Sequence, residues 1–503
     1  MGKENPIFWA DRTAQELIER ENSFKRGVKV FRCESGLGAS GIPHIGSVGD
    51  VLRQYAVALA LKDSGVKSEL ICYSDDRDGL RKVPSKFPDS LEKFIGAPVT
   101  SIPDPFKCHA SYGEHMSSIL VDAVEKLGLE YKFQSATDAY RKGILDAQIE
   151  KILGNVDDAG RIIQEMVGQE KFLQIYPYYP VCEKCGKIYT TRVVETLQKE
   201  HKVRYVCDQE FVGKNQNSGQ KIVVKGCGHE GETSYFKSDG KLAWKVEFAA
   251  RWDALKIVFE AVGKDILDSV KINDRISKEV LGFAPPLHMV YELFLEKGGE
   301  KISKSFGNVF TAQDWLRYGS PQSLNLLMFK RSAGARELSE NDIPVYMDEV
   351  DSLERIYSGE KKIANEKEFA HLKRLFEYVY FLKQPKTPRF KINYNVLANI
   401  TRVIPIEDKF KVIENMLEKS GHIDKLSKED KNILKERIAY ASNWIEVMGK
   451  DIRPQKIDIS NEERQALEKL LEALKEKLGA EEMQTLVFTT AKKFGIDAAR
   501  FFI

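Results

Sequence analysis

The 503-residue sequence has no long apolar run, no apolar core in its first residues and no even set of cysteines. It has no run of about 18 apolar residues, so we expect no membrane-spanning helix. Its first residues, Met1 to Pro6, hold no apolar core of a secretory signal, so we expect a cytoplasmic protein. The seven cysteines are scattered and odd in number, which argues against a disulfide framework and for a reducing compartment.

The chain also has little net charge. Its formal net charge is +2, with 30% charged and 42% hydrophobic residues, which is typical of a globular protein. A balanced total does not exclude a nucleic-acid partner, because phosphate binding depends on local patches of charge. The length exceeds what one hydrophobic core serves, so we expect about two to four domains.

A glycine-rich stretch between a predicted strand and a predicted helix is the most informative feature. The stretch from Phe31 to Ser47 contains His44 and four glycines: Gly36, Gly38, Gly41 and Gly46. Free N–H groups at a helix start favour a phosphate, and glycines let the backbone approach it closely. His44 can donate to charge that develops on a phosphoryl oxygen. These glycines, His44 and Ser47 are therefore candidates for binding ATP, although a capped glycine turn without a ligand is as common.

The segments around this stretch predict a doubly wound parallel sheet. Residues 28–33 and 70–73 are predicted strands, and the apolar residues between 48 and 60 have helical spacing. Together they form a βαβ unit. Ligands in such sheets bind beyond the carboxyl ends of the strands, where both the glycine stretch and an acidic run, Ser74 to Asp78, would lie.

The rest of the chain changes character several times. Residues 84–105 are rich in proline, residues 108–170 are mostly helical in pattern, and residues 176–236 are β-rich and carry cysteines. The sheet pattern resumes near residue 240. Beyond about 335, glycine is sparse and helical periodicity dominates.

These changes predict two domains. The first is an α/β domain over residues 1–335, interrupted by an insertion over about 85–236 whose last part, about 176–236, is the cysteine module. The second is an all-α domain over residues 336–503.

A second loop, Lys301-Ile302-Ser303-Lys304-Ser305, has glycines on both sides. Lys301 and Lys304 would neutralise a triphosphate as charge moves to the leaving pyrophosphate, with Ser303 and Ser305 as further ligands. A Lys-x-x-Lys pair by itself is more often a solvated basic turn.

Together the two loops resemble the paired signatures of class I aminoacyl-tRNA synthetases. His44-Ile45-Gly46-Ser47 stands at the place of His-Ile-Gly-His, and Lys301 to Ser305 at the place of Lys-Met-Ser-Lys-Ser. Ser47 removes one possible phosphate donor, although its hydroxyl can partly substitute. Ile302 for methionine is a volume-conserving apolar replacement.

Further motifs are similar to those of the class I lysyl-tRNA synthetases. They are Ser40 to Gly46, Asp75 to Pro84, Trp244-Lys245-Val246-Glu247 and Arg251-Trp252. The resemblance covers essentially the whole chain and is weakest beyond residue 335. It implies a Rossmann-type catalytic domain with inserted helical and zinc-ribbon-like modules, and a helical domain that reads the anticodon of tRNA(Lys). It also implies that ATP with Mg²⁺ activates L-lysine before transfer to tRNA(Lys). Nothing in the sequence demands a dimer, so we expect a monomer.

The expected substrate sets a requirement for its pocket. A lysine side chain brings an ammonium group and an apolar stem, so it needs a carboxylate and an aromatic face. The candidates are Glu34, Asp75, Trp244 and Glu247. Two alternatives stay open. One is a class I synthetase of another specificity, such as glutamate, which would need arginine; the other is a tRNA-binding relative without catalysis.

The cysteine module contains Cys182-Glu183-Lys184-Cys185, which has the spacing of a zinc knuckle. Cys227-Gly228-His229 offers a second half, so we expect Cys182, Cys185, Cys227 and His229 to bind Zn²⁺. Cys227 and His229 are only two apart, so Cys207 can replace either. The alternative is a ribbon whose cysteines are small buried groups.

Three other cysteines, Cys33, Cys72 and Cys108, have no evident partner and are expected in the core. His109 and His115 belong to no evident motif.

Overall fold

The structure is a computed structural model. It describes residues 7–39, 41–168, 175–292, 294–295, 310–404, 409–421, 423–448, 459–473 and 480–497. The chain divides into two compact units, Met1–Asn443 and Trp444–Ile503. Among the described residues, no helix combines the length and apolar character that a membrane crossing requires.

A five-stranded parallel sheet forms the centre of the first unit. Its strands, in spatial order, are β13 (Leu287–Tyr291), β12 (Ile257–Gly263), β1 (Phe31–Leu37), β2 (Ser68–Ser74) and β4 (Lys132–Ser135). All four neighbouring pairs are parallel. The chain builds from β1 first towards β2 and β4 and later towards β12 and β13, so the strand order reverses beside β1. Ligands in such sheets bind at this point.

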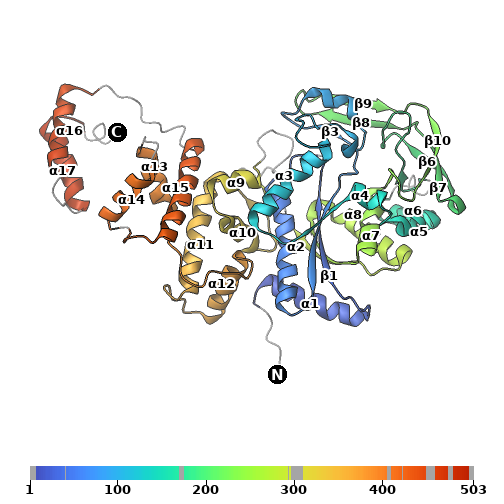
Figure 1. Ribbon diagram of the computed structural model, residues 1–503, viewed down its shortest axis with the longest axis horizontal. Helices are drawn as coiled ribbons and strands as arrows, with labels where there is room; N and C mark the ends of the chain where they lie inside the picture. Colours follow the sequence, from blue (N-terminus) through green and yellow to red (C-terminus); the bar gives the residue numbers. More distant parts are fainter. Residues whose placement is uncertain are drawn as a thin grey trace. The chain divides into compact units, whose positions relative to one another are not determined.

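Helices cover both faces of this sheet. Helix α2 (Ile45–Asp63) packs on β1, β2 and β12, and α1 (Trp9–Phe24) packs on α2. Because α1 covers its outer side, α2 is buried along most of its length. Helices α7 (Trp244–Leu255) and α8 (Leu267–Arg275) contact β12 from the other side of the sheet (Figure 1). The predicted parallel α/β architecture is confirmed.

The first strand runs later along the chain than the predicted residues 28–33. β1 pairs with β2 from Phe31 opposite Ser68 to Leu37 opposite Ser74. Glu34 and Gly36 therefore belong to the strand, and the glycine stretch begins inside the sheet.

The predicted helical stretch over residues 108–170 also supplies a strand of the main sheet. It contains α3 (Tyr112–Leu127), α4 (Ala136–Arg141), α5 (Asp146–Gly154) and α6 (Val156–Val167). Between α3 and α4, β4 pairs with β2. Residues 132–135 therefore do not belong to an insertion. This edge strand is short and partly exposed, so it has no apolar run that would reveal it.

Small sheets make up the β-rich part. One contains β3 (Lys82–Val83), β8 (Glu210–Asn215) and β9 (Lys221–Lys225), and another contains β6 (Arg192–Leu197), β7 (Lys202–Val206) and β10 (Glu230–Ser234). The two-stranded pairs are β5 (Tyr178–Tyr179) with β11 (Lys241–Leu242), and β14 (Phe294–Leu295) with β15 (Arg336–Glu337).

Helices follow to the end of the described chain. In the first unit they are α9 (Ala312–Tyr318), α10 (Pro321–Phe329), α11 (Ile343–Tyr357), α12 (Glu366–Val379), α13 (Tyr394–Val403), α14 (Lys409–Lys419) and α15 (Lys428–Met448), whose last turn crosses into the second unit. The second unit contains α16 (Asn461–Ala473) and α17 (Ala480–Lys493). α10 packs on α11 and α12, so the predicted boundary near residue 335 falls within the first unit.

Candidate active site

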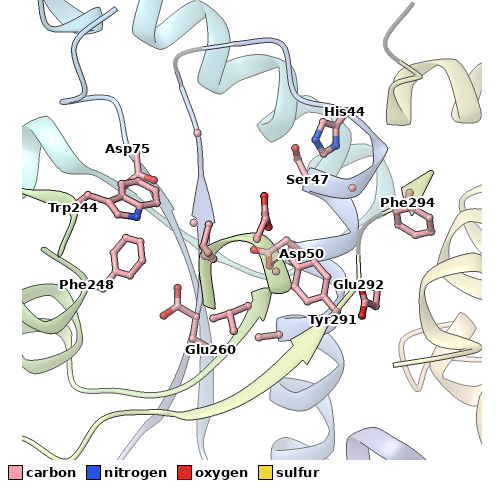
Figure 2. Close-up of a pocket in the computed structure, with 18 of the residues that line it drawn as sticks. His44, Ser47, Asp50, Asp75, Trp244, Phe248, Glu260, Tyr291, Glu292 and Phe294 are labelled. Atoms are coloured by element: carbon pink, nitrogen blue, oxygen red, sulfur yellow. Dashed lines mark hydrogen bonds between the residues drawn. The ribbon is translucent and has the colours of Figure 1, made fainter. Parts of the chain in front are cut away.

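A cavity of about 470 Å³ opens at the carboxyl ends of the parallel strands, where the strand order reverses. It is lined by Gly36, Gly38, His44, Gly46, Ser47, Asp50, Asp75, Lys82, Trp244, Phe248, Arg251, Glu260, Ala261, Val262, Gly263, Asp265, Ile266, Tyr291, Glu292 and Phe294. Figure 2 shows His44 and Ser47 on one side, Asp75, Trp244 and Phe248 on the other, and Asp50 between them. The cavity thus has two chemically different ends.

The end at His44 is built by the start of α2. His44 is the residue before the first helical turn, and its carbonyl accepts a hydrogen bond from Ser47 N at 2.8 Å. A Cβ on Gly46 would lie 2.8 Å from two atoms of the His44 ring. Any residue larger than glycine at this position would therefore displace the ring. Gly41, the remaining predicted glycine, is buried and does not line the cavity.

The second predicted loop, including Lys301, Ser303, Lys304 and Ser305, lies outside the described residues. The residues on either side of it are at the site. Phe294 lines the cavity, and the carbonyl of Phe310 accepts a hydrogen bond from Ile45 N at 2.9 Å.

At the other end, the buried guanidinium of Arg251 joins three carboxylates. Its Nη1 lies 2.8 Å from Asp75 Oδ1, and its Nη2 lies 3.0 Å from Glu34 Oε1 and 3.9 Å from Glu260 Oε1. Of these acids, Asp75 and Glu260 line the cavity, whereas Glu34 is completely buried and does not. Glu34 therefore holds Arg251 and is not open to a ligand.

Glu247 has a comparable internal partner. Its Oε2 lies 2.8 Å from Lys241 Nζ, and its Oε1 accepts a hydrogen bond from the Tyr140 hydroxyl at 2.9 Å. Lys241 also pairs with Asp78. Glu247 is buried and does not line the cavity, so of the four predicted lysine contacts only Asp75 and Trp244 line it.

Negative charge is in excess in the cavity wall. Five lining residues carry carboxylates: Asp50, Asp75, Glu260, Asp265 and Glu292. The lining lysine and arginine are Lys82 and Arg251, and Arg251 is already shared among buried acids. The wall therefore favours a cationic ligand group.

Two carboxyl groups in the wall have raised pKa values, and burial is the main cause for both. Burial, opposed by Arg251 and reinforced by Asp78 and Glu247, raises the pKa of Asp75 to about 7. Burial, reinforced by Glu34, also raises the pKa of Glu260 well above its usual value. Such shifts cluster at functional sites.

Glu260 and Asp50 are site residues that the sequence reasoning missed. Glu260 interrupts the apolar strand β12 and accepts a hydrogen bond from Trp252 Nε1 at 2.6 Å. In the sequence, Glu260 could have been recognised as a single charged residue within an otherwise apolar strand. Asp50 accepts hydrogen bonds from Ser35 Oγ at 2.5 Å and the Tyr291 hydroxyl at 2.7 Å.

An aromatic pair completes this end of the cavity. The rings of Trp244 and Phe248, one turn apart on α7, are 4.6 Å apart between centroids and meet edge to face. The Phe248 ring also lies 4.7 Å from the Arg251 guanidinium carbon. An apolar stem could lie on these rings with its charged tip at the carboxylates.

Four cysteine sulfurs of the β-rich part lie within 4.8 Å of one another: those of Cys182, Cys185, Cys207 and Cys227. Cys207, the open alternative in the sequence, thus takes the fourth place. His229 instead contacts Glu183, with Nε2 2.7 Å from Oε1. Four thiols in such a cluster suit a structural zinc ion.

A second group of metal-ligand type, Asp104, Cys108, His109 and His115, also lies within 4.8 Å. Cys108 Sγ is 3.2 Å from Nδ1 of both His109 and His115. The expectation that Cys108 lies in the core is wrong, because its side chain is exposed. This group is hard to predict from the sequence, since Asp104 belongs to no short cysteine–histidine motif.

Comparison with known proteins agrees with this geometry. The family described as "tRNA synthetases class I (K)" matches residues 7–381. A "Lysine--tRNA ligase" from Cenarchaeum symbiosum is 47% identical over 98% of this chain and 92% of that protein. A "Lysine--tRNA ligase" from Rickettsia bellii (strain OSU 85-389) is 34% identical over 80% of this chain and 73% of that protein.

A solved structure of Mycobacterium tuberculosis methionyl-tRNA synthetase in complex with methionyl-adenylate is 11% identical, with a TM-score of 0.40, and covers 82% of this chain and 89% of that chain. It is too distant to add to the assignment. The assignment rests on the family match and the relatives of similar length: the chain belongs to the class I tRNA synthetases of the K type.

Proposed function

We propose that the chain is a lysine–tRNA ligase, which activates L-lysine with ATP and transfers it to tRNA(Lys). The observation that carries the specificity is the acidic, aromatic end of the cavity. Asp75 and Glu260 would face the lysine side-chain ammonium, and Trp244 would cover its stem. The names of the relatives from Cenarchaeum and Rickettsia agree with this substrate.

The other end of the cavity would bind ATP. Gly46 lies beside His44 and Ser47 at the start of α2, whose N–H groups favour phosphate, and Gly36 and Gly38 also line the cavity and would contact the nucleotide. Lys301, Ser303, Lys304 and Ser305 would bind the triphosphate from the second loop. Mg²⁺ would accompany ATP, since oxygen ligands from phosphates and carboxylates suit this ion and Asp50, Asp265 and Glu292 line the cavity.

In the first step, the α-carboxylate of lysine attacks the α-phosphorus of ATP, and pyrophosphate leaves from lysyl-adenylate. In the second, a ribose hydroxyl of tRNA(Lys), the 2′-hydroxyl by resemblance to the class, attacks the adenylate carbonyl and releases AMP. No covalent enzyme nucleophile is required. His44, Lys301 and Lys304 would act by positioning the reactants and stabilising phosphate charge.

A glutamate specificity would require a free arginine in the cavity. Arg251 is the lining arginine, and its Nη atoms lie 2.8 Å from Asp75 and 3.0 Å from Glu34. Its charge is therefore already balanced, which favours a cationic substrate. The presence of His44, Lys301 and Lys304 argues against an inactive relative.

The helices beyond residue 335 would form the all-α domain that reads the anticodon, and the protein would act as a cytoplasmic monomer. In the zinc-ribbon-like module, Cys182, Cys185, Cys207 and Cys227 would hold one structural Zn²⁺.

The mixed group at Asp104 would hold a second Zn²⁺ with Cys108, His109 and His115. Its carboxylate, thiol and imidazole donors are all zinc ligands, and a fully protein-ligated site would stabilise the local fold.

Lysine-dependent ATP–pyrophosphate exchange tests the function. The exchange should be measured with lysine, glutamate and ornithine, each with and without tRNA(Lys), because some members of the class need tRNA for activation. We expect exchange with lysine and none with glutamate. Exchange with glutamate alone, or no exchange with lysine under either condition, would reject the proposal.

The loop assignment has its own test. Lys304→Ala should lower adenylate formation at least tenfold, because charge on the leaving pyrophosphate loses a partner. Its affinity for tRNA(Lys) should stay near that of the wild type. A large loss of tRNA affinity instead would assign this loop to RNA binding.

A further inference from the structure

Three lysines form a row across the small sheet β3–β8–β9. Lys82 of β3 is the register partner of Lys214 of β8, and Lys214 is the register partner of Lys221 of β9. Residues paired in this way point to the same face, and neighbouring strands lie about 4.8 Å apart. The three side chains are therefore neighbours.

The row lies on the outer face of the sheet. The residues that follow two of these lysines, Val83 and Asn215, are buried on the opposite face. A Cβ on Gly213 would lie 2.5 Å from the Ile95 side chain, so the inner face is packed closely. Lys214 and Lys221 are exposed, and Lys82 is half-buried.

Within the described part of the chain, none of the three lysines has a carboxylate within ion-pair distance. Burial, and then the nearby charge of Lys214, lower the pKa of Lys82. Like charges directly opposite each other destabilise a sheet. Such a row is consistent with a surface that meets an anion. Lys225 lies on the same face but is not part of a row of like charges, because its register partner is the acidic Glu210.

The row begins at the active site. Lys82 lines the cavity, and Lys214 and Lys221 continue away from it, one strand at a time. β3, β8 and β9 lie together beyond one end of the main-sheet strands, and α1 lies near the other end (Figure 1). Next to the row, Val212 and Val223 are register partners and are 51% and 52% exposed.

We propose that this row, Lys82–Lys214–Lys221, binds the phosphate backbone of the single-stranded 3′ end of tRNA and guides its terminal ribose into the cavity. The proposal rests on the proposed function, which requires such an end to reach the adenylate. Lysines bind phosphates as point charges, and the two valines offer an apolar surface to sugars or bases. A nucleotide held inside the cavity would meet Lys82, whereas a strand that enters from outside meets all three lysines.

The test compares Lys214→Gln/Lys221→Gln with Lys225→Gln, which removes a lysine from the same exposed face. Binding is measured with labelled tRNA(Lys) and with the same tRNA shortened by its single-stranded 3′ nucleotides, at several salt concentrations. For the intact tRNA, we expect the double variant to bind about tenfold more weakly than the wild type. We also expect the slope of log K against log salt to be less steep by about 1.4, which is about 0.7 for each of the two lost phosphate contacts. For the shortened tRNA it should bind like the wild type. In aminoacylation, the KM for tRNA should rise, while the KM values for lysine and ATP should not.

Several outcomes would overturn the proposal. They are equal tRNA affinity of the double variant and the wild type, an equal loss with Lys225→Gln, and an equal loss with the shortened tRNA. A rise in the KM for ATP alone would show that the row binds ATP and not the 3′ end of tRNA. These binding results do not depend on catalysis, so a failed lysine exchange in the wild type would reject the proposed function separately.

Discussion

Asp75 is the titratable residue at the acidic end of the cavity whose pKa lies near neutrality. Burial raises this pKa to about 7, against the opposing effect of Arg251. Above this value the carboxylate is charged and can pair with a substrate ammonium. Below it the carboxyl is neutral, and a cationic ligand must first displace its proton.

The affinity for lysine should therefore rise with pH, by about tenfold between pH 6 and pH 8, and then level off. Binding near pH 7 should release protons, which calorimetry in two buffers of different ionisation enthalpy would detect. Asp75→Asn should bind lysine more weakly and lose this pH dependence. A wild-type affinity that is flat over this range would show that Asp75 does not meet the ammonium.

The sequence could place Asp75 and Trp244 at the strand ends, but it could not tell an open carboxylate from one with an internal partner. Arg251, which follows Asp75 by 176 residues, pairs with both Asp75 and Glu34, but of these two acids Asp75 lines the cavity and Glu34 does not. Such pairings depend on long-range packing of α7 against the sheet. The sequence pattern of α7 contains no sign of them.

The start of α2 shows how an element places the side chain of His44, which we propose to be catalytic. Residue 46 has ordinary helical backbone angles, so the backbone conformation does not require glycine at this position. A Cβ there would lie 2.8 Å from the His44 ring. Gly49, one turn later, is also tight, but its Cβ would meet the flexible Met328 side chain at 2.9 Å and Arg53 at 3.0 Å.

Gly46→Ala should therefore displace His44 and lower the rate of adenylate formation at least tenfold, with little change in thermal stability. Alanine favours a helix by about 1 kcal/mol over glycine, which offsets part of the strain. Gly49→Ala is the matched control: it should change the melting temperature but not the KM for ATP. Pre-steady-state adenylate formation and thermal melts would distinguish the two. Normal activity of Gly46→Ala would mean that the ring position is not critical.

The fold brings two sets of metal-ligand side chains together, four cysteines in the β-rich part and a mixed group beside the start of α3. Elemental analysis of the purified chain should find about two zinc ions. Cys207→Ser should lose one of them and lower the melting temperature, because a structural zinc site stabilises its local fold. His229→Ala should keep both, and His115→Ala should lose the other. Full zinc content in Cys207→Ser together with zinc loss in His229→Ala would restore the ligand set first predicted from the sequence.

Some helices and strands could be predicted from sequence patterns and others could not, and the difference has a physical cause. The strand–glycine–helix unit at β1 and α2 was visible because buried parallel strands and helices leave clear apolar patterns. β4 was not, because an edge strand with exposed Lys132 and Phe133 needs no such pattern. Cys207 remained an alternative because only the pairing of β7 with β10 brings it to Cys227.

At the scale of the whole molecule, the chain divides after Asn443, although helical periodicity suggested a boundary near residue 335. Helices α11 and α12 lie beyond residue 335 but pack on α10 as part of the first unit. Arg374 of α12 shows the connection: its Nη2 lies 2.8 Å from Asp11 of α1 and 2.6 Å from Asp63 of α2. The composition therefore changes well before the first compact unit ends.

The family match ends at residue 381, and α16 and α17 pack against each other in the second unit. A chain that ends at Met448 should therefore keep the cavity and its chemistry. We expect its melting temperature to stay within about 3 °C of that of the full chain, and its lysine-dependent exchange at saturating tRNA(Lys) to stay within twofold. Its affinity for tRNA(Lys) should fall at least tenfold if the carboxyl-terminal helices read the anticodon. Unchanged affinity would place anticodon recognition in α11 to α15, whereas loss of exchange would show that the second unit is needed to form the active site.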